Sequence, residues 1–203
     1  MAMKLTITNF LQFFSGIAPL LLGFFLIMIS LFNQDIKGII YLAGVLIACV
    51  INVFFQNLIK SERSSDESPI CNLIDLPFGI NQFNSPALSS LFIAFTIAYL
   101  VLPMNFNGNM NYVILAALLS LFALDGVTKV FNKCTTIGGV FLGALTGFLL
   151  GAGWYTLFHV SGYDSLLYFD ELKSNNVVCK RPSKQTFKCS VYKNGQLIQS
   201  NVV

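Results

Sequence analysis

The chain has 203 residues, of which 55% are hydrophobic and only 10% are charged, and its net charge is +3 at pH 7. A soluble domain carries about 25% charged residues. This composition, with a mean hydropathy of +0.72, excludes an ordinary soluble domain and predicts a multi-span membrane protein.

The first 60 residues predict a helical hairpin in the membrane. The apolar segments 10–32 and 38–58 are the first two expected spans, and the polar turn 33–37 joins them. The first segment is longer than the roughly 7–15 apolar residues of a signal peptide and lacks a small-residue cleavage site, so we expect it to be retained. Pro19 lies inside it, where either a kink or simple tolerance explains it.

Two amides lie within the second apolar segment. Asn52 and Gln56 are four residues apart and therefore share a helical face. They either line a polar pathway or form hydrogen bonds between helices. Two amides without a charge make a poor route for ions, so we favour hydrogen bonding.

The first substantial extramembrane segment covers residues 60–85. It begins with a charged, Ser-rich stretch that reads as a loop. Residues 70–83 then mix apolar side chains with a Pro and a Gly, and they are too short and interrupted to span a bilayer. We expect them at the lipid interface or folded over the bundle, with a ligand lid as the alternative.

A third span is predicted over residues 86–104. Ser85 suits the helix cap and Pro86 suits the first helical turn. Pro103 is expected to close this helix. An uncharged turn over residues 105–111 then leads to the next span.

The fourth expected span, residues 112–131, contains two opposite charges. Asp125 and Lys129 are spaced i and i+4, the distance at which helical side chains form ion pairs. Ionisable residues at membrane depth are functional candidates. Both lie in the last third of the helix, where Lys can reach the interface, so we favour an interfacial ion pair over a proton or ion relay.

The fifth expected span, residues 137–160, contains no Asp, Glu, Lys or Arg. A glycine occurs at every fourth position, which creates a smooth face that another helix can approach closely. This face packs either within the protein or against a second copy, and we favour the first. His159 lies at the end of the span and reads as an interfacial residue rather than a ligand or base. The glycines are Gly139, Gly143, Gly147 and Gly151.

The distribution of Lys and Arg near the span ends predicts the orientation. With five spans, the N-terminus, residues 60–85 and residues 132–136 share one side of the membrane. That side has the larger number of basic residues, which favours the cytoplasm for the N-terminus and the opposite face for the tail. If the fourth segment does not span, the tail is instead on the cytoplasmic side. The basic residues on the two sides are Lys4, Lys60, Arg63, Lys129 and Lys133 against Lys37 and Lys173.

These observations divide the chain into a transmembrane domain, residues 1–160, and a tail, residues 161–203. Residues 186–199 alternate like strands around Asn194-Gly195, a preferred hairpin turn. In that register Tyr192 faces Leu197 and Val191 faces Ile198. The fold class is therefore an all-α integral membrane protein of about five transmembrane helices with a small C-terminal module containing a β-hairpin.

Two further features mark the tail. Cys179 and Cys189 either form a disulfide across the strands or remain two free thiols. A cluster of basic residues gives the module a positive surface that suits an acidic partner or lipid headgroups. Its members are Lys180, Arg181, Lys184, Lys188 and Lys193.

The most distinctive sequence is CKRPSKQTFKCSVYKNGQLI, residues 179–198. With the small multi-span body, it resembles membrane proteins of large double-stranded DNA viruses of algae and protists. The resemblance implies a virion protein of the internal membrane beneath an icosahedral capsid, made in a host endomembrane, whose tail contacts capsid or core proteins. It transfers no functional residue.

We therefore expect a structural virion membrane protein rather than an enzyme, and no catalytic residue is assigned. The five Cys form no CxxC pair and the chain has one His, so no metal or cofactor is expected. The partners are the bilayer, membrane or capsid proteins, and a second copy of the chain if the glycine face is external; nucleic acid is not expected. The alternative is a small channel or transporter whose polar lining comes from Asn52, Gln56, Asp125, Lys129 and His159.

Overall fold

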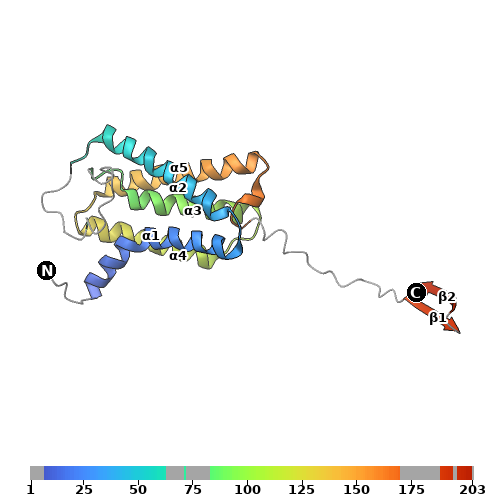
Figure 1. Ribbon diagram of the computed structural model, residues 1–203. Helices are drawn as coiled ribbons and strands as arrows, with labels where there is room; N and C mark the ends of the chain where they lie inside the picture. The colour runs from blue at the N-terminus through green and yellow to red at the C-terminus, as the bar shows by residue number, and fades with distance from the viewer. Residues whose placement is uncertain (1–6, 63–70, 72–82, 170–187, 194–195, 203) are drawn as a thin grey trace. The chain divides into compact units, whose positions relative to one another are not determined.

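The computed structural model describes residues 7–62, 71, 83–169, 188–193 and 196–202. The chain forms two compact units, Met1–Lys173 and Ser174–Val203. Within the described residues, the first unit is a bundle of five helices, each long and apolar enough to cross a membrane (Figure 1). The predicted multi-pass helical membrane fold is confirmed. The helices are α1 (Ile7–Asn33), α2 (Lys37–Ile59), α3 (Leu88–Phe106), α4 (Tyr112–Phe131) and α5 (Ile137–Val160).

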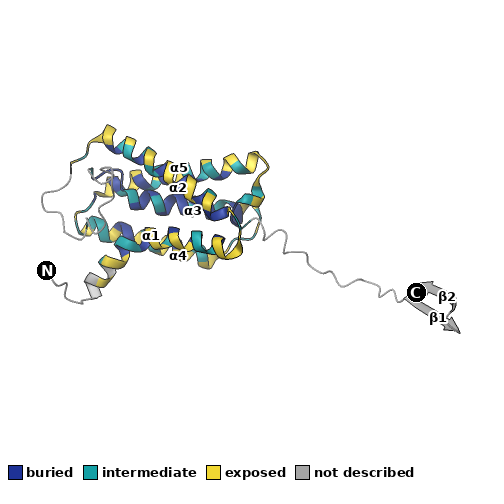
Figure 2. Ribbon diagram, in the orientation of Figure 1, coloured by how far each residue is buried: buried dark blue, intermediate teal, exposed yellow. Residues whose placement is uncertain are grey.

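The bundle has the polarity expected of a protein dissolved in lipid. Much of its outer surface consists of exposed residues (Figure 2). Many of these are large and apolar, such as Phe25, which is 63% exposed, and Phe141, which is 67% exposed. Polar side chains such as Asn52, Thr96 and Asp125 are completely buried. In water this arrangement would be unstable, whereas hydrocarbon favours apolar exposure and interior polar contacts.

Helix α3 is the centre of the bundle. Two thirds of its apolar window is buried, compared with 17% for α4. Its Phe95 and Tyr99 pack against Tyr41 of α2 with ring centroids 5.6–6.3 Å apart. The Tyr41 hydroxyl forms a 2.7 Å hydrogen bond with Thr96, so the polar end of this buried ring is satisfied.

The ends of α3 differ from the prediction. The helix begins at Leu88, and the residue at its cap position is Ala87, so Ser85 does not cap it. The backbone before α3 instead contacts other helices: the Ala87 N–H donates to the Gly139 carbonyl at 3.0 Å. Pro103 lies inside α3 and does not close it, since the helix continues to Phe106.

The connections between helices use local side-chain caps. Ser30 donates to the Asp35 carboxylate at 2.6 Å and accepts from the Gly38 N–H at 2.8 Å, which closes the turn between α1 and α2. The Asn111 side chain accepts hydrogen bonds from the N–H groups of Val113 and Ile114 in the first turn of α4. The Thr136 hydroxyl accepts one from the Gly139 N–H in the first turn of α5. Such caps satisfy backbone donors that would otherwise be unpaired at the membrane surface.

The chain stays attached to the bundle beyond α5. After the short 3-10 helix η3 (Asp164–Leu166), Leu167 and Tyr168 are buried against the core. The Tyr168 hydroxyl donates to the Leu26 carbonyl at 2.6 Å, and the Asn107 amide donates to the Phe169 carbonyl at 3.4 Å. Burial raises the pKa of Tyr168 to about 12, so this hydroxyl keeps its proton near neutral pH.

The second unit contains strands β1 (Lys188–Lys193) and β2 (Gln196–Val202), which pair antiparallel. Tyr192 pairs with Leu197. Val191 pairs with Gln199 rather than with Ile198, because the register shifts between Val191 and Tyr192. The expected register was therefore wrong at this position, since an irregularity of one residue changes every later pair on that strand.

Candidate functional site

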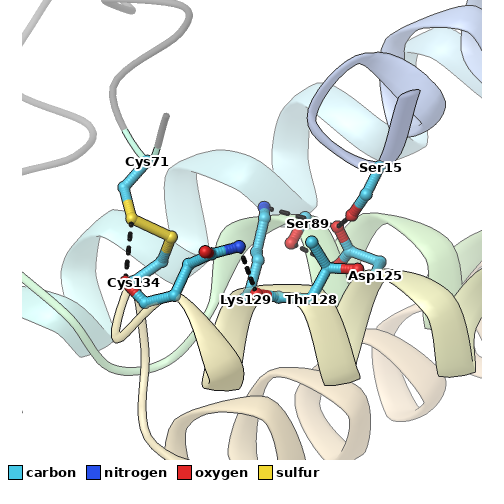
Figure 3. Close-up of polar contacts among 8 residues, drawn as sticks. Ser15, Cys71, Ser89, Asp125, Thr128, Lys129 and Cys134 are labelled. Carbon is cyan, nitrogen blue, oxygen red and sulfur yellow. Dashed lines mark hydrogen bonds and ion pairs between the residues drawn. A yellow bond between two sulfur atoms is a disulfide. The ribbon is translucent and has the colours of Figure 1, made fainter. Parts of the chain in front are cut away.

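A buried carboxylate lies where α1, α3 and α4 meet (Figure 3). Asp125 of α4 is completely buried, and its two oxygens accept hydrogen bonds from Ser89 at 2.7 Å and Ser15 at 3.4 Å. Lys129 Nζ lies 3.5 Å from the same carboxylate, one helical turn away. The i and i+4 spacing in the sequence indicated the Asp–Lys contact, and the structure places the carboxylate in the interior of the bundle.

The two partners of this ion pair differ in exposure. The Asp125 side chain is 0% exposed and that of Lys129 is 25% exposed. A buried carboxylate is costly unless donors surround it. The two serines and Lys129 provide those donors, while the longer Lys side chain extends toward the end of α4. One ion pair therefore connects the core of the bundle to its edge.

A second layer of contacts lies at the same end of the bundle. Gln12 of α1 donates to the Asn132 side chain at 2.8 Å, and Asn132 donates to the Thr128 carbonyl at 2.8 Å. A disulfide joins Cys71 to Cys134, 63 positions apart, and the Cys71 sulfur lies 3.7 Å from the Asn132 carbonyl oxygen (Figure 3). The turn after α4 is thus tied to both α1 and the loop that precedes α3.

A cavity of about 380 Å³ lies beside these contacts. This volume is within the roughly 300–1,000 Å³ range of ligand pockets. One part of its wall is polar and includes Gln12, Lys129 and Asn132. The other part is apolar and includes Leu20 of α1 and Leu46 of α2.

The two amides of α2 form hydrogen bonds to one backbone atom. The Gln56 and Asn52 side chains donate to the Pro86 carbonyl at 2.9 and 3.4 Å. Both are buried. The carbonyl before α3 is thereby satisfied from α2, which is the interhelical role that the sequence favoured over a polar pathway.

His159 of α5 contacts the last residue of α3, whereas Asp125 of α4 contacts the first turn of α3. Its Nδ1 is 2.7 Å from the Asp164 carboxylate, and its ring stacks on Phe106 and Tyr155. Ser89, which binds Asp125, is in the first turn of α3, whereas Phe106 is its last residue. Of the residues considered for a polar lining, Gln56 and Lys129 line the same cavity, whereas His159 lies apart from them in the described structure.

The glycine face of α5 packs directly on the backbone of α3 and of the residues that precede it. A Cβ added at Gly143 would lie 2.5 Å from the Ala87 carbonyl oxygen, and one at Gly151 would lie 2.5 Å from that of Phe95. A Cβ at Gly147 would collide with the Leu91 carbonyl oxygen. Contacts that advance in the same direction on both helices show that α3 and α5 are parallel. The four contacts pair Gly139, Gly143, Gly147 and Gly151 with Asn84, Ala87, Leu91 and Phe95, respectively.

Most of the predicted tail site lies outside the described residues. This applies to Cys179, so the bridge proposed between Cys179 and Cys189 is not described, and to Lys180, Arg181 and Lys184. Lys188 and Lys193 are the first and last residues of β1.

Three parts of the site were not anticipated: Ser15, Ser89 and the Cys71–Cys134 disulfide. Nothing local in the sequence distinguishes the two serines, which are 110 and 36 positions from Asp125. For the disulfide, the sequence did contain a signal. The expected topology put residues 60–85 and 132–136 on the same side of the membrane, and each segment contains one Cys.

No protein-family model, curated protein or solved structure matches this chain.

Proposed function

We propose that this chain is a structural membrane protein without catalytic activity, whose helical bundle anchors a basic C-terminal module to the membrane. The module docks on an acidic protein layer. Following the resemblance of the tail, that layer is formed by the capsid or core proteins of a virus particle, and the membrane is the internal membrane of the virion.

The observation that carries this proposal is the attachment of the tail to the bundle. Leu167 is 1% exposed and Tyr168 is 8% exposed, and both belong to the apolar core. The hydrogen bond from Tyr168 to Leu26 joins this segment to the last third of α1. The segment from which the tail begins is therefore part of the bundle.

The close contact between α3 and α5 supports the same function. The glycines remove the side chains that would separate the helices, so the α5 backbone touches that of α3 and of the residues just before it along the whole glycine face. The last turn of α5 leads directly into the attached segment 161–169. A rigid helix pair therefore bears the start of the tail.

The test is cross-linking in the native membrane from a photoreactive side chain placed at Tyr192. The wild-type chain should yield one predominant protein partner. A variant with Glu at the five basic positions of the tail should lose that product, whereas a control that exchanges Lys and Arg at the same positions should keep it. A tail that binds anionic lipid vesicles and cross-links to no protein would overturn the proposal.

A further inference from the structure

We propose that the cavity beside Asp125 and Lys129 binds one membrane phospholipid, with the phosphodiester at Lys129 and an acyl chain between α1 and α2. This inference is independent of the proposed docking function. It rests on the position of the cavity, on the separation of its polar and apolar walls, and on the charge at its polar end.

The cavity opens toward the bilayer. Leu20, Leu42 and Leu46 line it, and each is also exposed on the outer surface of the bundle, by 48, 37 and 57%. In a bilayer, that surface is covered by hydrocarbon. An acyl chain is therefore the molecule that meets this apolar part of the opening.

The polar end lies at the depth of lipid headgroups. Lys129 and Asn132 are at the end of α4, and Gln12 begins the apolar window of α1. From Gln12 to Leu20, α1 rises by about 12 Å. This matches most of the roughly 15 Å of hydrocarbon in one leaflet, half of the bilayer core. A lipid of that leaflet thus fits with its headgroup at the polar end.

Lys129 provides the charge that a phosphodiester needs. Its ammonium has three donors, and the contact with Asp125 at 3.5 Å uses one of them. Asp125 in turn is held by Ser15 and Ser89, so it positions the ammonium at the cavity wall. Lys is a common binder of phosphate as a point charge.

Gly16 gives a direct way to fill the cavity. It lines the cavity, and a Cβ added there would meet no atom within 4 Å. A Phe at this position can therefore enter the space without disturbing the helix. Gly138 is the matched control: its added Cβ would lie 3.9 Å from the nearest atom, and it does not line the cavity.

The experiment measures phospholipid that co-purifies with the full chain in mild detergent, by native mass spectrometry and phosphorus content. We expect about one phospholipid per chain, at least a tenfold loss in Gly16→Phe and Lys129→Gln, and wild-type retention in Gly138→Phe and Lys133→Gln. Exchange against added lipids should favour phosphatidylcholine over diacylglycerol, and Lys129→Gln should abolish this preference. Equal retention by Gly16→Phe and Gly138→Phe would overturn the site, and equal binding of the two added lipids by the wild type would overturn the phosphate contact.

A second inference comes from the disulfide. Disulfides persist in oxidising compartments and are rare in the cytosol. The Cys71–Cys134 bond therefore points to an oxidising environment for residues 60–85 and 132–136. With five crossings, the N-terminus shares that side and the tail lies on the reducing side, which is the reverse of the orientation expected from the Lys and Arg distribution.

Sealed microsomes that contain the full chain test this orientation. A C-terminal epitope should be digested by added protease without detergent, and alkylation without reductant should leave Cys71 and Cys134 unmodified. An epitope protected until detergent is added would overturn the orientation, and free thiols at both positions would remove its premise. Neither result depends on whether the tail docks on a protein.

Discussion

Replacing Gly147 by Ala should separate α3 from α5. The added Cβ would lie 2.8 Å from the Leu91 Cα and would collide with the Leu91 carbonyl oxygen. Carbon atoms pack at about 3.5–4.0 Å, so the helices must move apart by at least about 0.7 Å. A gap of this size costs about a quarter to a half of each dispersion contact across the interface. We therefore expect a loss of about 1–3 kcal/mol in the free energy of unfolding, as for other overpacked cores.

The control for this variant is Gly153→Ala on the same helix. A Cβ at Gly153 meets no atom within 4 Å, so this variant changes helix propensity without changing the interface. Unfolding by SDS in mixed micelles, followed through the fluorescence of Trp154, the single Trp of the chain, measures both variants. If Gly147→Ala is as stable as Gly153→Ala, the close contact between the backbones does not stabilise the bundle.

Three further predictions use the same unfolding measurement. Asp125→Asn should cost about 1.5–3 kcal/mol, the value of hydrogen bonds to a charged group, because Lys129 loses its counter-ion; a change below about 0.5 kcal/mol would contradict the buried cluster. Cys71→Ser should cost up to about 4 kcal/mol from the entropy of a loop of this length, and reductant should destabilise the wild type but not the variant. Trp154→Phe, followed by circular dichroism, should cost about 1 kcal/mol because the indole N–H no longer donates to the Ile40 carbonyl at 3.2 Å; unchanged stability would show that this bond contributes nothing.

The helices were predictable because a membrane leaves a strong signal in the sequence. Each span is a long apolar segment, and α4 and α5 begin and end at the expected residues. The predicted start of α3, at Pro86, was wrong because contacts with distant helices override the local signal of Ser85 and Pro86. Its end was wrong because the backbone at Pro103 continues as a helix despite the missing N–H.

The site was predictable only where its residues are neighbours along one helix. Helical spacing alone places Lys129 next to Asp125. Ser15 and Ser89 reach the same carboxylate from two other helices, and no local pattern shows which of the buried serines do so. The glycine face of α5 was visible in the sequence for the same reason, but its partner, α3, became known only from the packing.

The spacing of the glycine repeat does not by itself determine the axial alignment of α5 against α3. Sliding α5 along α3 by four residues, about 6 Å, would again set glycines against the α3 backbone, so the repeat permits several alignments of similar fit. The contacts at the two ends select one of them. At one end the Ala87 N–H reaches the Gly139 carbonyl and Thr135 donates to the Asn84 carbonyl at 2.8 Å.

At the other end, Trp154 lies against Gly44 of α2, where an added Cβ would be 2.6 Å from the indole nitrogen. A one-turn slip would remove the indole from this hollow and break its hydrogen bond to α2. The glycines therefore decide how closely the two helices approach, and the end contacts decide their axial alignment. Closeness and alignment are specified by different residues, so a mutation can disturb either one while leaving the other intact.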